Sequence, residues 1–180
     1  YHFRIMAVNS LGTTYGTDLT FIPMLSDVDG NQYKTVTIGS QIWMAENLKT
    51  TKYNDGTTIP LVTTTWNTLL TPAYCWYDND EATNKNIYGA LYNWYTVNVG
   101  NLCPIGWHVP TDADWDTLQT FVALGDAVTN EYGNGIAGER LKEAFALHWG
   151  ASNNSDNSSG FTALPGTSLT FLEWTKMAIK

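Results

Sequence analysis

The stretch PTDADWDTLQTFV, residues 110–122, predicts the most regular element of the chain, an α-helix with one apolar face. Thr111 suits the N-cap, and Asp114 stands three positions later, where a capping box has its acidic partner. Acidic side chains in the first turn also interact favourably with the helix dipole. Apolar residues recur at helical spacing on one face: Trp115, Leu118 and Val122. We therefore expect the longest or second longest helix here, with one face on a core.

Shorter elements surround this helix. Residues 34–38 and 41–44 are typical of two strands joined by a turn at Gly39. Apolar spacing indicates two further helical segments, one over residues 88–95 and one over residues 138–147. The sequence thus predicts an irregular α+β domain with two or three short helices and short antiparallel strands.

Residues 1–22 predict a separate N-terminal β-hairpin. The first eight side chains alternate with a period of two, residues 9–12 form a turn, and strand-forming residues follow. This segment resembles the last two strands of a fibronectin type III or related immunoglobulin-like domain, whose remainder we expect before Tyr1. The alternative is an extra hairpin of the main domain. Residues 23–26 are then a linker.

Composition excludes several classes of protein. The 180-residue chain has 9 basic and 17 acidic residues, a formal net charge of −8. This balance argues against a nucleic-acid surface and against attraction to an anionic membrane. No apolar run approaches the length of a membrane span. Abundant Thr, Asn, Gly and aromatic residues, with an even number of cysteines, favour an extracellular or cell-surface location, reached through a signal upstream of Tyr1.

Four sequence blocks resemble a known bacterial family. In chain order they are DGNQY (29–33), IGSQIWMAENL (38–48), YGALYNW (88–94) and CPIGWHVPT (103–111). They are similar to the Fibrobacter succinogenes major paralogous domain, found in bacterial secreted and surface proteins. The resemblance covers residues 27–166, so we interpret residues 27–180 as one such domain. Residues 167–180 do not match, and we expect a domain truncated at its C-terminus, with an unpaired sheet edge.

The family resemblance implies a fold and a location more than a reaction. It implies a C-type-lectin-like fold, similar to that of formylglycine-generating enzymes, because VPTDADW at residues 109–115 looks like an LPTEAEW element of those enzymes. Family members often follow immunoglobulin-like modules, which agrees with the hairpin at residues 1–22.

Aromatic side chains are the first candidates for ligand binding. Trp66, Trp76 and Tyr77 lie in predicted loops, where exposed rings stack on sugar rings. The tryptophans inside the family-like blocks and the helix that follows them are expected in the core, since each buries a large apolar area. They are Trp43, Trp94, Trp107 and Trp115. The expected partner is a polysaccharide or a surface protein.

Carboxylates provide candidate cation ligands. Asp78, Asp80 and Glu81 offer hard oxygen ligands on one loop and are a candidate calcium site, with a solvated loop as the alternative. Residues 27–31 also alternate acidic and amide side chains. Their glycine falls at the wrong position for an EF-hand, so a polar turn is the preferred interpretation. We expect no other cofactor.

The two cysteines, Cys75 and Cys103, are compatible with one disulfide. The resemblance instead implies that Cys103 pairs with a later cysteine that this chain lacks, which would leave two thiols. Formylglycine-generating enzymes use a thiol pair. The resemblance implies that this pair lies in a late part of the fold, which we expect this chain to lack. His108 has no partner at metal-ligand spacing and is interpreted as a structural histidine.

Two classes of function are favoured, and a third interpretation is a protein that binds no ligand. The first is a non-catalytic surface or secreted module for adhesion or glycan binding, which requires exposed aromatic rings and loop carboxylates. The second is an enzyme related to formylglycine-generating proteins, which requires a reactive thiol pair in a groove. The third is a display scaffold.

Overall fold

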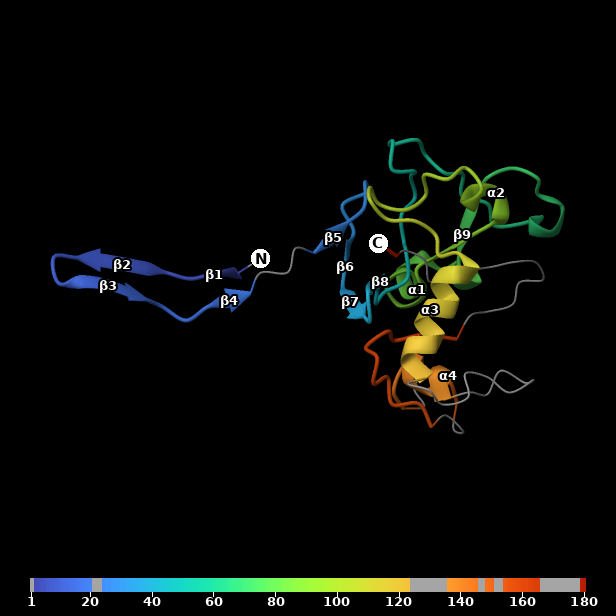
Figure 1. Cartoon of the computed structure of the whole chain (residues 1–180). Coiled ribbons are helices and arrows are strands. Elements are labelled where there is room, and N and C mark those ends of the chain that lie inside the picture. The colour runs from blue at the N-terminus through green and yellow to red at the C-terminus, as the bar shows by residue number, and fades with distance from the viewer. Residues whose placement is uncertain (1, 21–23, 124–135, 146–147, 151–153, 166–178) are drawn as a thin grey trace.

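A computed structural model describes residues 2–20, 24–123, 136–145, 148–150, 154–165 and 179–180 (Figure 1). The strands are β1 (His2–Phe3), β2 (Met6–Asn9), β3 (Gly12–Tyr15), β4 (Leu19–Thr20), β5 (Leu25–Ser26), β6 (Gln32–Tyr33), β7 (Thr35–Ile38), β8 (Gln41–Met44), β9 (Tyr74–Trp76) and β10 (Ala90–Tyr92). The helices are α1 (Glu81–Tyr88), α2 (Trp94–Val97), α3 (Asp112–Ala123) and α4 (Ile136–Leu141), with 3₁₀ turns η1 (Trp66–Thr68) and η2 (Tyr77–Asn79). The α+β class is confirmed, with four short α-helices in the described ranges.

The strands pair antiparallel in two-stranded sheets, which are β1–β4, β2–β3, β5–β6, β7–β8 and β9–β10. The N-terminal hairpin forms as predicted and projects away from the remaining elements (Figure 1). Its turn is held by Asn9 Oδ1, which accepts hydrogen bonds from the amides of Leu11 (2.8 Å) and Gly12 (3.1 Å). The large apolar side chains between Ile5 and Tyr15 are exposed, Leu11 to 95%.

Helix α3 has the predicted capping box. The amide and hydroxyl of Thr111 donate to the Asp114 carboxylate at 2.8 and 2.6 Å, and the Asp114 amide donates back to Thr111 Oγ1 at 3.3 Å. These bonds satisfy donors that the first helical turn leaves without intrahelical partners. Leu118 and Val122 are buried, and Trp115 is partly buried. The predicted helix and its apolar face are therefore confirmed.

The core consists of two clusters of buried side chains. One surrounds the β9–β10 pair and contains Tyr33, Met44, Leu48, Tyr53, Ile59, Tyr74, Trp76, Ala90, Tyr92, Leu102 and Cys103. The other lies between β7, β8, α3 and α4 and contains Ile38, Trp43, Leu118, Val122, Ala123, Ala137, Phe161 and Ile179. The Trp43 ring lies 5.0 Å from that of Trp115 and 5.5 Å from that of Phe161. Helix α3 thus packs on the β7–β8 hairpin.

The helical segment indicated over residues 88–95 is wrong. Helix α1 ends at Tyr88 because Gly89 has φ +69°, and residues 90–92 continue as strand β10. A Cβ atom at position 89 would lie 2.5 Å from the Leu48 carbonyl oxygen and 2.8 Å from Asn47 Cβ. Both the backbone angle and the close approach therefore require glycine. Asn93 then caps a separate single-turn helix, α2.

Helix α4 is shorter than the helix expected over residues 138–147. After Leu141 the backbone pairs with another segment, since the Glu143 amide donates to the Ala163 carbonyl and the Ala163 amide donates to the Leu141 carbonyl. This pairing takes backbone groups that a longer helix would use. Residues 146–147 lie outside the described residues.

The C-terminal residues 179–180 pair with one edge of strand β8. Ile179 is 2% exposed and forms bridges with Trp43 of β8 and with His108. The Lys180 amide also donates to the Ile42 carbonyl at 3.1 Å. The expectation of an open edge is therefore wrong at this part of β8.

Candidate ligand-binding pockets

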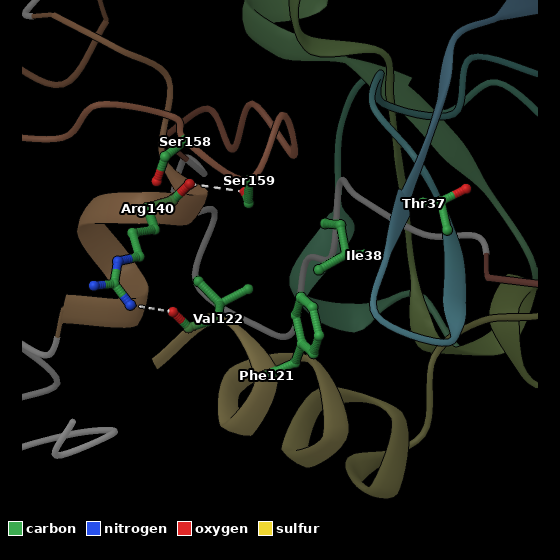
Figure 2. A pocket seen from close by; sticks show the side chains of 7 residues that line it. All are labelled: Thr37, Ile38, Phe121, Val122, Arg140, Ser158 and Ser159. Carbon is green, nitrogen blue, oxygen red and sulfur yellow. Dashed lines mark hydrogen bonds between the residues drawn. The ribbon is translucent and has the colours of Figure 1, made fainter. Parts of the chain in front are cut away.

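Helices α3 and α4 and strand β7 line an open pocket of about 330 Å³ (Figure 2). We call it the Phe121 pocket, and its described lining residues are Thr37, Ile38, Phe121, Val122, Arg140, Ser158 and Ser159. Ile38 and Val122 form an apolar floor, each 4% exposed. The Phe121 ring is 50% exposed and stands beside them. The pocket thus combines an accessible aromatic ring with hydroxyl groups and a guanidinium.

Hydrogen bonds to the backbone fix the polar side of the Phe121 pocket. The Arg140 guanidinium donates to the Val122 carbonyl, which ties α4 to the end of α3. The Ser159 hydroxyl donates to the Arg140 carbonyl at 2.7 Å, which holds the loop carrying Ser158 and Ser159 against α4. Figure 2 shows both bonds.

Gly39 lies against the Phe121 ring. It has φ +61° in the β7–β8 turn, and a Cβ atom there would lie 2.9 Å from Phe121 Cδ2. The close approach places the turn directly against the Phe121 ring. The sequence predicts the turn at Gly39 but indicates no binding role for Phe121 or Arg140. The one feature of the sequence that pointed to Phe121 was its position beside the apolar face of the predicted helix.

A second cavity of about 220 Å³ has more charged and amide side chains in its described lining. We call it the His148 pocket, and its described lining residues are Ala45, Glu46, Asn47, Lys49, Asn86, Ile87, Glu143, His148, Thr162 and Leu164. His148 Nδ1 lies 2.7 Å from Glu143 Oε2. Four of its residues belong to the AENLK sequence that follows β8, so a family-like block supplies one wall.

The predicted aromatic site does not assemble as one exposed surface. Trp76 lies in β9 and is 3% exposed, so its prediction as a surface ring is wrong. Trp66 is partly buried, and its Nε1 donates to the Val62 carbonyl at 2.8 Å. Tyr77 is partly buried and lies edge-on to Tyr88 at 5.2 Å.

Of the predicted core tryptophans, Trp94 differs from expectation. Trp43 is buried, and Trp107 and Trp115 are partly buried against the core clusters. Trp94, by contrast, is 56% exposed. Helix α2 has a single turn, and its buried side chain is that of Thr96. The Thr96 hydroxyl is hydrogen-bonded to the backbone amide and carbonyl of Ala73.

The predicted calcium ligands have local structural contacts. Asp80 caps α1 by accepting a hydrogen bond from the Thr83 amide at 3.1 Å. Hydrogen bonding from Thr83 lowers the pKa of the Asp80 carboxyl group. Glu81 pairs with Lys85 at 2.9 Å, one helical turn later. Asp78 is exposed. In the described ranges, no three His, Cys, Asp or Glu side chains converge as a metal site. Calcium at this loop stays a prediction.

The loop at residues 27–31 is the polar turn that was preferred. Asp27 accepts hydrogen bonds from the Asn31 amide (2.9 Å) and the Tyr33 hydroxyl (2.5 Å). Asp29 accepts from the Thr51 amide at 2.6 Å and pairs with Lys52 at 3.0 Å. Protein donors therefore surround both carboxylates.

Both cysteines are buried, Cys75 in β9 and Cys103 in the first core cluster. The structure does not join them to each other by a disulfide. Burial raises the pKa of the Cys103 thiol to about 12. His108 Nε2 lies 3.2 Å from Asp114 Oδ2, beside the α3 cap, as a structural histidine would.

These features define an α+β domain with two surface cavities beside α3, α4 and the segment after β8. The chain belongs to the Fibrobacter succinogenes major domain family, a bacterial paralogous domain, whose sequence model matches residues 36–177. The match includes residues 167–177, so the expectation that these lie outside the resemblance is wrong. Comparisons with curated proteins and with solved structures gave no match. Among the described helices, none is long and apolar enough to cross a bilayer.

Proposed function

We propose that this domain is a non-catalytic glycan-binding module of a bacterial cell-surface or secreted protein. The observation that carries the proposal is the Phe121 pocket. Sugars have apolar C–H faces and many hydroxyl groups, so they are complemented by an aromatic ring beside polar side chains. The Phe121 ring is 50% exposed beside Arg140, Ser158 and Ser159. The volume of about 330 Å³ lies at the lower end of the range for small-molecule sites.

The chemistry of the described residues supports binding over catalysis. The described residues lining the Phe121 pocket include no histidine, carboxylate, lysine, cysteine or tyrosine, the side chains that usually act as general acids, bases or nucleophiles. The raised pKa of Cys103 leaves little thiolate, the form that reacts as a nucleophile. An enzyme related to formylglycine-generating proteins remains the alternative to be tested.

The test is binding of the 180-residue chain to a glycan array, with and without a calcium chelator. The informative variant is Phe121→Leu, which keeps apolar bulk but removes the aromatic face. Because an aromatic contact contributes about 0.5–1.5 kcal/mol beyond burial, we expect glycan affinity to fall about threefold to tenfold. Phe145→Leu is the matched control, since Phe145 is 81% exposed and does not line the pocket.

Each outcome separates the alternatives. Loss of binding in Phe121→Leu alone supports the proposal, and an equal loss in Phe145→Leu contradicts the assignment to this pocket. Failure of the wild-type chain to bind any glycan favours a display scaffold. Loss of binding on chelation would support calcium at Asp78, Asp80 and Glu81. Oxidation of a cysteine-containing peptide by the chain would instead favour the enzyme.

A further inference from the structure

The single-turn helix α2 leaves two neighbouring aromatic side chains exposed to solvent. Trp94 is 56% exposed and Tyr95 is 38% exposed, so both rings forfeit part of the stabilisation that burial gives. Leu70, which is 72% exposed, lies next to this helix, because Asn93 Nδ2 donates to the carbonyl of Thr71 at 2.8 Å. We call the side chains of Leu70, Trp94 and Tyr95 the Trp94 face.

A buried polar network holds α2 in place. The side chains of Asn93 and Thr96 are 9% and 0% exposed. Asn93 Oδ1 accepts a hydrogen bond from the Thr96 amide at 3.0 Å, and the Ala73 amide donates to Thr96 Oγ1 at 2.7 Å. The backbone that carries Trp94 and Tyr95 is therefore fixed without a ligand, which lowers the entropic cost of binding one.

Charge is absent from the two stretches of sequence that carry the Trp94 face. Residues 56–77 and 86–111 contain no Asp, Glu, Lys or Arg, whereas the whole chain has 17 acidic and 9 basic residues. His108, near the end of the second stretch, is the one histidine in them. A charged polymer would find no opposite charge in these stretches and would lose hydration of its own charges on contact. The charge pattern therefore favours an uncharged ligand.

Uncharged hydroxyl groups accompany the apolar side chains in the first stretch. The exposed threonines between positions 63 and 71 are Thr63, Thr64, Thr65, Thr68 and Thr71. A hydroxyl both donates and accepts hydrogen bonds without carrying charge. Charged side chains begin at the border, where Asp55 accepts a hydrogen bond from Asn101 Nδ2 at 3.0 Å. Aromatic rings beside uncharged hydroxyls complement the C–H faces and hydroxyl groups of neutral sugars.

We propose that the Trp94 face is a second glycan-binding surface, and that its ligand is an uncharged polysaccharide whose rings stack on Trp94 and Tyr95. Helices α2 and α4 lie toward opposite ends of the main domain, so this surface is separate from the Phe121 pocket (Figure 1). The inference rests on the proposed function for the class of ligand, but it does not depend on the Phe121 pocket.

The test is sedimentation of the 180-residue chain with insoluble polysaccharides. The neutral probes are cellulose, mannan and starch, and cross-linked polygalacturonate is the charged probe. The buffer contains about 0.5 M NaCl, which shortens the Debye length to a few ångströms and screens repulsion between the acidic chain and the charged probe. We expect at least one neutral polymer to sediment the chain and polygalacturonate to leave it in solution.

Two variants test the assignment to the Trp94 face. Trp94→Ala and Tyr95→Ala each remove one ring and should each weaken binding to the neutral polymer about tenfold, the scale of one aromatic contact with its buried area. Both should keep the Tm within about 3 °C, because the rings lie largely outside the core. Trp94→Phe keeps a ring and should retain most of the binding. Tyr15→Ala is the matched control, since Tyr15 is 51% exposed on the hairpin.

Several results would overturn the proposal. Unchanged binding in both Trp94→Ala and Tyr95→Ala, or an equal loss in Tyr15→Ala, would show that the polymer does not bind at this face. Equal sedimentation by polygalacturonate would contradict the neutral ligand class. A dimer in light scattering that Trp94→Ala dissociates would show that a second copy covers the face instead.

The Phe121→Leu variant separates this proposal from the first one. It should leave sedimentation with the neutral polymer unchanged, since Phe121 lies in the other site. Loss of sedimentation in Phe121→Leu, with none in Trp94→Ala, would leave the Phe121 pocket as the site and refute the second surface. Failure of all three neutral polymers to sediment the wild-type chain would also refute it, whereas the Phe121 pocket is judged by the glycan array.

Discussion

At the scale of single residues, Gly89 occupies a position that requires glycine. Its φ of +69° and ψ of −162° lie in a backbone region that is essentially restricted to glycine. Gly89→Ala would add backbone strain and push a methyl group against the Leu48 carbonyl. We expect the free energy of unfolding to fall by about 2–4 kcal/mol, measured by urea denaturation.

Gly138→Ala is the matched control for that substitution. Gly138 lies inside α4, and the nearest atom to an added Cβ would be Lys142 Cε at 4.0 Å. Alanine is favoured over glycine by about 0.5–1 kcal/mol in a helix, so this variant should be neutral or more stable. Equal destabilisation by the two substitutions would contradict the role assigned to the backbone at Gly89.

Asp29 gives the chain a specific sensitivity to acid. Burial alone raises the pKa of its carboxyl group, but hydrogen bonds from Thr51, Lys52 and Thr50 outweigh this effect and lower the pKa to about 2. The folded pKa is below the ordinary value of 3.8, so the stabilisation is complete above about pH 4 and is lost as the pH falls toward 2.

Asp29→Asn tests this pH dependence. It should lower stability at neutral pH by about 1–3 kcal/mol and flatten the stability profile between pH 4 and pH 2, followed by urea melts. Asp116→Asn, at an exposed position of α3, is the control and should keep the wild-type slope. An unchanged slope in Asp29→Asn would show that other carboxylates control acid unfolding.

At the scale of secondary structure, the sequence predicted elements whose signals are local. Helix α3 has its cap, its acidic first turn and its apolar face within one continuous stretch. The segment after Tyr88 could not be predicted in this way. Apolar spacing favoured a helix, but the contact of Gly89 with Leu48, 41 positions earlier, ends α1 and starts β10. Trp76 was misassigned for the same reason, because its strand pairs with β10.

The candidate sites depended even more on long-range contacts. The Phe121 pocket joins residues 37–38 of β7, the end of α3, Arg140 of α4 and a loop at residues 158–159. No motif links these positions in the sequence. The position of the Asn47 side chain likewise depends on a contact far along the chain, since its Nδ2 donates to the Tyr88 carbonyl. The family could be predicted because its blocks are continuous, whereas the cavities between them could not.

At the scale of the whole molecule, the N-terminal hairpin and the main domain should unfold independently. Among the described residues, strands β1 to β4 pair only with one another, and the large apolar side chains between Ile5 and Tyr15 are exposed. An isolated two-stranded hairpin is marginally stable, so it contributes little to the main cooperative transition. Deleting residues 1–22 should therefore shift the Tm of the main domain by no more than about 2 °C in calorimetry.

A matched pair of isoleucine variants sharpens that prediction. Ile5→Ala changes a side chain that is 77% exposed on the hairpin, and Ile38→Ala changes one that is 4% exposed in the second core cluster. We expect the first to cost less than about 0.5 kcal/mol and the second about 2–5 kcal/mol. A large cost for Ile5→Ala, or a large fall in Tm on deleting residues 1–22, would show that the hairpin packs on the main core. The alternative of an extra hairpin within a single domain would then be correct.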